Sequence, residues 1–169
     1  LPNPKFVEVD PNNIFLSRSN SYRLPAEMIR DNALATSGLL VKHVGGQSVK
    51  PYQPEGLWKE KSNFSIKLMN YKESSGDSLY RRSMYTFIRR TSPPPSMTTF
   101  DAPTREVCTV KREVTNTPLQ ALVLLNDPQF FEASRILAER IQKEAPNSID
   151  ESISLGFRIC TSREPKRKS

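Results

Sequence analysis

At 169 residues the chain is long enough to form one domain with a buried core. Its hydrophobic content of 36% is low, and fourteen prolines against six glycines predict long irregular segments. The most apolar run, from Leu119 to Leu125, is far too short to cross a bilayer, which excludes a membrane-spanning helix. Because the chain starts without a methionine or a signal peptide, we expect it to be part of a longer protein with any signal upstream.

The net charge of +7 is unevenly distributed. Seven basic and two acidic residues lie between Arg81 and Arg112. Such a zone could attract phosphate, sulfate or carboxylate groups. The favoured alternative is that these arginines pair with nearby Asp and Glu side chains.

Residues 1–22 are predicted to form an extended lead-in with a turn at Asp-Pro-Asn-Asn, residues 10–13. A helix should begin near Pro25, since proline suits the first helical position, and should weaken at Gly38. Its inward stripe is predicted to comprise Ala26, Ile29, Ala33, Thr36 and Leu40.

Residues 45–76 show no clear periodicity, and Tyr52 and Trp58 are the expected anchors against the core. Residues 79–90 fit either a helix or a strand, and their length favours a helix. The Ser-Pro-Pro-Pro run at 92–95 should end that helix and continue as polyproline II.

The last third carries the clearest helix signals. Thr117 is expected to cap a short helix that runs through Leu125, and Asp127 to cap a longer one that ends near Glu144. A proline follows each cap, at the first helical position. The longer helix is predicted to bury Phe130, Ala133, Leu137 and Ile141.

A third helix should follow, because Ser148 and Glu151 have the spacing of a capping box. Its inward residues are predicted to be Ile149, Ile153, Phe157 and Cys160. Three helices joined by tight breaks can bury each other's apolar stripes. The predicted fold class is therefore mainly α: a small helical bundle with long ordered Pro-containing loops and little or no sheet.

The sequence matches none of the common motifs for cofactor binding or for a catalytic nucleophile that we compared with it. Cys108 and Cys160 lie 52 positions apart, so no Cys-x-x-Cys-His site for haem is present, and two buried free thiols are favoured over a disulfide. His43 is the only histidine, which excludes a His-rich zinc site within the chain, and we expect it in a surface loop. Neither a P-loop nor a nucleophile elbow is present.

What remains is a dense set of polar residues between the arginine zone and the last helices. Polar groups packed around proline turns usually satisfy one another and the free ends of helices, and this structural role is favoured. The functional alternative is an arginine cradle for an anionic group. The candidate residues are Arg81, Arg82, Arg89, Arg90, Asp101, Arg105, Glu106, Arg112, Thr115, Asn116, Gln120, Asn126 and Asp127.

Two further functions stay open. Asp101 and Glu106 could form the acidic pair of a carbohydrate-active enzyme in an Arg-lined cleft, although nearby arginines would lower their pKa values. The aromatic residues among the arginines could stack on bases of a nucleic acid, a weaker hypothesis.

Several longer motifs resemble one bacterial family. They are Arg-Leu-Pro-Ala-Glu-Met-Ile-Arg-Asp at 23–31, Gly-Gly-Gln-Ser-Val-Lys-Pro-Tyr at 45–52, Leu-Tyr-Arg-Arg-Ser at 79–83, Phe-Asp-Ala-Pro at 100–103 and Thr-Asn-Thr-Pro-Leu-Gln-Ala-Leu at 115–122. The resemblance covers roughly residues 8–165. It is to the planctomycete-type domain called domain of unknown function 1553.

The resemblance implies a C-terminal domain of a large exported protein, with a periplasmic or extracellular location. It also implies an upstream partner domain and haem c elsewhere in the parent protein. Such proteins are frequent in bacteria that degrade complex polysaccharides. The family supplies no catalytic residue.

The leading hypothesis is a non-catalytic interaction module that packs against the upstream domain of the same protein, with an anionic glycan as a further candidate partner. No cofactor is predicted in this chain, and an enzyme is the less favoured class. The predicted organisation is a lead-in at 1–22, one helical domain at 23–162 and a truncated basic tail at 163–169.

Overall fold

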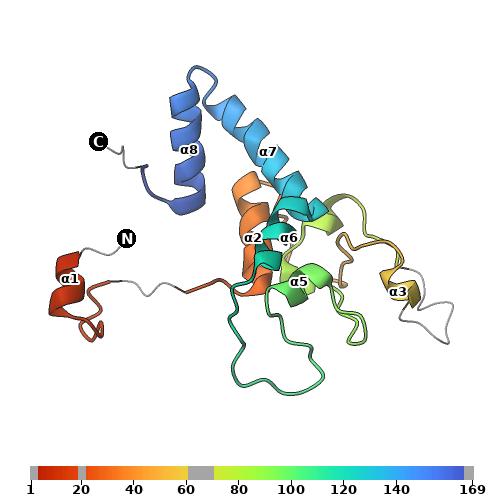
Figure 1. Cartoon of the computed structure of the whole chain (residues 1–169). Coiled ribbons are helices and arrows are strands. Elements are labelled where there is room, and N and C mark those ends of the chain that lie inside the picture. Colours follow the sequence, from red (N-terminus) through yellow and green to blue (C-terminus); the bar gives the residue numbers. More distant parts are fainter. Residues whose placement is uncertain (1–3, 19–21, 61–70, 166–169) are drawn as a thin grey trace.

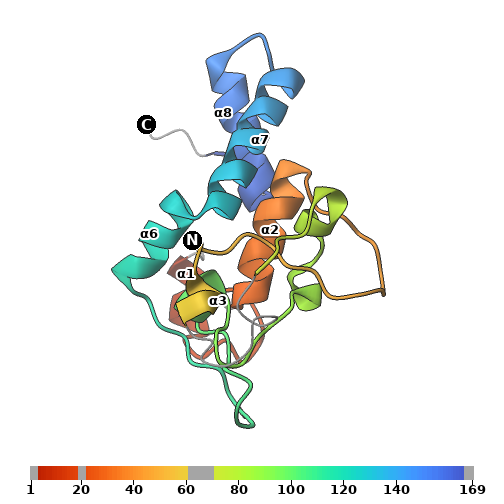
Figure 2. The same ribbon diagram turned by 90° about the vertical axis from the view of Figure 1, so that its right-hand side faces the viewer.

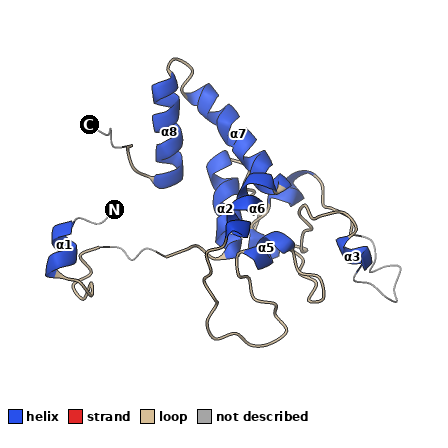
Figure 3. Ribbon diagram, in the orientation of Figure 1, coloured by secondary structure: helices blue, strands red, loops and turns tan. Residues whose placement is uncertain are grey.

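The computed structural model describes residues 4–18, 22–60 and 71–165. Within these ranges the chain is built from helices and loops, with isolated bridges but no strand (Figure 3). The prediction of a mainly α fold is therefore confirmed. No helix in the described ranges is long and apolar enough to span a membrane. Of the predicted basic tail, residues 166–169 lie outside the described residues.

The core lies where α2 (Ala26–Ser37), α6 (Pro118–Asn126) and α7 (Pro128–Glu144) meet the short α5 (Pro95–Thr99) (Figure 1). Its buried centre consists of Ala26, Met97, Phe100 and Phe130. Helix α8 (Ile149–Thr161) folds back along α7, away from this centre (Figure 2).

Helix α2 begins near Pro25, as predicted, but Pro25 is its N-cap and not its first helical residue; Gly38 is in the left-handed region at the C-cap. Its predicted stripe is only partly correct. Ala26 is buried, but the other fully buried positions are Arg30, Leu34 and Ser37. The buried positions form one stripe that is rotated around α2 from the predicted one, and Ile29 and Ala33 pack against the core while only partly buried. Helix α2 contacts both α7 and the 83–85 segment.

The caps of α6 and α7 confirm the sequence prediction. The Thr117 N–H donates to Gln120 Oε1 at 3.4 Å, and the Gln129 N–H donates to the Asp127 carboxylate at 2.9 Å. Phe130 and Ala133 are buried, as expected, whereas Leu137 and Ile141 are only partly buried.

The predicted inward face of α8 is wrong. Ile149, Ile153 and Phe157 are exposed, and both cysteine thiols are free but exposed rather than buried. Helix α8 approaches α7 closely at Gly156, where an added Cβ would lie 2.9 Å from Ile141 Cδ1. Its half-buried positions include Ser152, Leu155 and Ile159, on a face beside the predicted stripe.

The predicted helix over 79–90 is also wrong. The chain forms two 3₁₀ turns, η1 (Gly76–Tyr80) and η2 (Ser83–Tyr85). Thr86 then forms an isolated β-bridge with Val49. Residues distant in sequence form hydrogen bonds with the backbone of this segment. The Ser83 N–H donates to Asp31 Oδ1 at 2.7 Å, and the Val49 N–H donates to the Tyr85 carbonyl at 2.8 Å. These bonds replace the local ones that an α-helix would make.

The middle loop is anchored by Trp58, which is buried in α3 (Leu57–Glu60) against Tyr71 and Phe87, while Tyr52 is half-buried. After it, Pro94 has the φ and ψ of polyproline II, but α5 begins directly behind it and was not predicted.

The lead-in is not simply extended. Residues Pro4–Val9 form α1, followed by the predicted turn at 10–13, in which the Asn13 N–H donates to the Asp10 carbonyl at 3.0 Å. Buried Asp10 then accepts the Ile14 N–H at 2.8 Å and the Phe15 N–H at 3.0 Å. Figure 1 shows this unit standing apart from the helical body.

Candidate functional site

The thirteen candidate polar residues do not gather around one point. Hydrogen bonds join Asp101, Thr115 and Gln120, and one cavity is lined by both Asn126 and Asp127. Arg81, Arg82, Arg89 and Arg112 have separate partners, described below. Arg90, Arg105, Glu106 and Asn116 are exposed.

Asp101 is the centre of a hydrogen-bonded clasp that closes the end of α5. Its carboxylate accepts the Thr115 N–H at 2.8 Å and the Thr115 hydroxyl at 2.9 Å, and it forms an ion pair with Arg23. Arg23 also donates to the Thr115 carbonyl. The Arg23 guanidinium and the Thr115 N–H hold the pKa of Asp101 below its usual range.

Gln120 extends the clasp into the core, where it is only 5% exposed. Its amide nitrogen donates to the Thr99 carbonyl and to Thr115 Oγ1, both at 3.0 Å, while its oxygen completes the α6 cap. These groups fasten the extended segment before α6 to the end of α5. Sequence reasoning included Gln120 and Asp101 but missed Arg23, whose partners lie more than 75 residues away.

Four arginines of the basic zone have partners of their own. Arg112 binds Glu27 with nitrogen–oxygen distances of 2.6 and 3.1 Å, and Arg82 contacts Asp31 at 3.3 Å. Buried Arg81 donates to the carbonyls of residues 43, 45 and 47 and stacks on Tyr85. The Arg89 guanidinium lies 5.2 Å from the centre of a Trp58 ring.

Arg30 was not among the candidates, yet it is the most engaged arginine near the core. It is 5% exposed, and its guanidinium donates to Gln129 Oε1 at 2.5 Å and to the Ser83 hydroxyl at 3.2 Å. It also donates to the Leu79 and Arg81 carbonyls, at 2.6 and 2.8 Å. Its position among apolar residues of α2 gave no signal of this role in the sequence.

The acidic pair considered for carbohydrate chemistry has unequal members. Asp101 is occupied by Arg23 and Thr115, whereas Glu106 is exposed in the loop between α5 and α6. Residues 105–112 are not helical, so Arg105 and Arg112 do not share a helical face. No cluster of three potential metal ligands occurs in the part of the chain that the structure describes.

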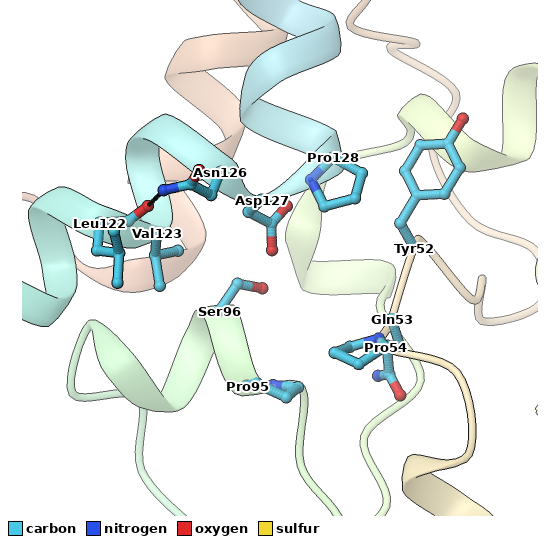
Figure 4. Close-up of a pocket in the computed structure, with 10 residues that line it drawn as sticks. All are labelled: Tyr52, Gln53, Pro54, Pro95, Ser96, Leu122, Val123, Asn126, Asp127 and Pro128. Carbon is cyan, nitrogen blue, oxygen red and sulfur yellow. Dashed lines mark hydrogen bonds between the residues drawn. The ribbon is translucent and has the colours of Figure 1, made fainter.

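A cavity of about 450 Å³ lies between α5, the α6–α7 junction and the 52–54 segment (Figure 4). Its lining is largely apolar. Asp127 points into the space toward Ser96, and the Asn126 amide turns back to donate to the Leu122 carbonyl at 2.9 Å. Its ten lining residues are Tyr52, Gln53, Pro54, Pro95, Ser96, Leu122, Val123, Asn126, Asp127 and Pro128.

Helix α6 presents a leucine ridge beside this cavity, which we define as Leu119, Leu122 and Leu125. Their exposed fractions are 55%, 55% and 72%. At 100° per residue these positions span one third of the helix circumference, while Gln120 is the buried residue on the opposite side. A helix that is apolar on nearly all sides is normally covered on nearly all sides.

Comparison with known protein families gives a match over almost the whole chain. The model of a family described as "Protein of unknown function (DUF1553)", PSD1, matches residues 2–169. No match was found among curated proteins or among solved structures. The chain therefore belongs to the DUF1553 family of proteins of unknown function.

Proposed function

We propose that this chain is a non-catalytic interaction module, and that the leucine ridge of α6 packs against another domain of the same, longer protein. The observation that carries the proposal is the burial pattern of α6: its glutamine is buried, and all four of its leucines are exposed, three of them on the ridge. Leaving three leucines in water forgoes roughly 1 kcal/mol or more of burial energy for each side chain. A partner surface that covers them would recover that free energy.

The state of the polar residues supports the same proposal. A general acid or base needs a free carboxyl group whose pKa suits proton transfer near neutral pH. Asp101 instead has a lowered pKa and is surrounded by donors that hold two chain segments together. Its arrangement suits a structural clasp.

The resemblance noted in the sequence supports the setting that we propose. The partner is an upstream domain of an exported, cytochrome c-associated protein of the planctomycete type, and any haem c is bound outside this chain. In that setting the module positions neighbouring domains of a protein linked to polysaccharide degradation.

Hydroxyl-radical footprinting tests this proposal. The oxidation rates of Leu119, Leu122 and Leu125 are compared between this chain alone and the full-length protein. We expect at least fivefold protection of the ridge in the full-length protein. Val44, which is 84% exposed in a loop, is the internal control. Equal ridge oxidation in both samples would refute the proposal.

A further inference from the structure

The cavity beside α6 is preformed. Pro54, Pro95 and Pro128 form three parts of its wall, and proline side chains have almost no rotamer freedom to lose. Leu122 and Val123 provide the remaining apolar surface. Its volume of about 450 Å³ lies within the range of protein sites that take a single ligand or a large side chain.

The cavity and the leucine ridge form one continuous surface, because Leu122 belongs to both. A small molecule could fill the cavity but would leave Leu119 and Leu125 in water. A protein helix lying along α6 can cover the ridge and place one side chain in the cavity at the same time. The shape therefore favours a helical segment of a partner domain as the occupant.

Asp127 is the one acidic or basic side chain among the ten residues of the cavity wall, all of which the structure describes. Its carboxylate caps α7, but the helix dipole offsets only about half of a unit charge. Arg30 is the nearby cation, and its guanidinium donates to Gln129, Ser83 and two backbone carbonyls instead.

The effects on the pKa of Asp127 also indicate that its negative charge lacks a full partner within this chain. Burial raises the pKa of Asp127 above its usual range, although the Gln129 and Phe130 N–H groups and Arg30 act in the opposite direction. The charged form is therefore undercompensated within this chain. A cation brought by an occupant would restore the compensation.

We propose that the docking partner is an amphipathic helix that inserts one large apolar side chain into the cavity and pairs an adjacent Lys or Arg with Asp127. This inference rests on the proposed function and specifies its partner. The helix covers Leu119, Leu122 and Leu125 with its apolar stripe. Its basic residue gives the docking its direction and register, as charged contacts commonly do at interfaces.

Fluorescence anisotropy with designed peptides tests the charge. The peptides are labelled 16-residue helices with one leucine stripe, in which Lys, Gln or Glu is scanned through the four polar positions that flank the central leucine. We expect the best Lys peptide to bind this chain about tenfold more tightly than its Gln counterpart, and the Glu peptide to bind more weakly still. A peptide whose stripe leucines are replaced by serine should not bind.

Two chain variants locate the effect. Asp127→Asn keeps a good helix cap and removes the charge, so it should erase the Lys preference while apolar binding remains. Glu55→Gln removes an exposed carboxylate next to the cavity wall and should preserve that preference. If Asp127→Asn does not fold, the Lys, Gln and Glu peptides on the unmodified chain decide alone.

Equal affinities of the Lys, Gln and Glu peptides at every scanned position would overturn the pairing with Asp127. The footprinting of the ridge does not depend on that charge. Protection of the ridge together with equal peptide affinities would therefore refute only the pairing with Asp127. An unprotected ridge would refute the proposed docking function itself.

Discussion

The substitution Asp101→Asn separates a structural clasp from a functional acid. Asparagine keeps one acceptor oxygen and tolerates the left-handed backbone at this position, where φ is 60°. It loses the negative charge, and its NH₂ group must face a donor, either Arg23 or Thr115. Because the Asp101 side chain is only 15% exposed, solvent cannot fully replace the lost partners.

The expected loss follows from the bonds that are removed. Hydrogen bonds to a charged group each contribute about 1.5–3 kcal/mol, and the variant weakens at least one of them and the ion pair. We expect Asp101→Asn to lower the free energy of unfolding by about 2–4 kcal/mol, as measured by urea denaturation at pH 7. Glu106→Gln makes the same chemical change at an exposed carboxylate and should stay within about 0.5 kcal/mol.

The pH dependence supplies a second readout. The folded-state pKa of Asp101 is lowered from its ordinary value of 3.8, so its contribution is complete above the unfolded-state pKa and is lost as pH falls through the folded-state value. The stability difference between wild type and Asp101→Asn should therefore be constant near neutral pH and shrink below about pH 4. A variant as stable as wild type, or more stable, would refute the structural role, since polar groups kept for activity commonly cost stability.

Substitutions at two other positions test the packing. Arg30→Met should cost about 3–5 kcal/mol in urea denaturation, because it leaves two backbone carbonyls and Gln129 without their buried donor. Gly156→Leu should separate α8 from α7, because the new side chain would collide with Ile141. The separation should appear as faster amide hydrogen exchange over residues 149–161. Gly156→Ala should have a smaller effect, since alanine gains about 1 kcal/mol of helix propensity over glycine. Unchanged stability or unchanged exchange, respectively, would contradict these contacts.

The parts of the fold that sequence predicted well are those determined locally. Thr117 and Asp127, each followed by proline, placed the starts of α6 and α7 correctly because a cap acts within one helical turn. The helix predicted over residues 79–90 was wrong because Asp31 and Val49, which are distant in sequence, form hydrogen bonds with the backbone of that segment. No local periodicity encodes such bonds.

Helix α8 and the candidate site show a different limit. The apolar stripe of Ile149, Ile153 and Phe157 is present as predicted, but periodicity reports which face can be buried and not whether this chain buries it. The polar set contained Asp101, Thr115 and Gln120, which do bind one another. Their partner Arg23 was missed because an arginine before a proline-started helix has no distinguishing pattern.

The stability of a ridge variant in two contexts tests the central claim most directly. Leu122→Lys combined with Leu125→Lys should change the unfolding free energy of this chain alone by no more than about 1 kcal/mol, because both side chains are already exposed. In the full-length protein the same pair should destabilise the domain by at least about 3 kcal/mol, since two charges would have to enter an apolar interface. Equal effects in the two contexts would contradict the account.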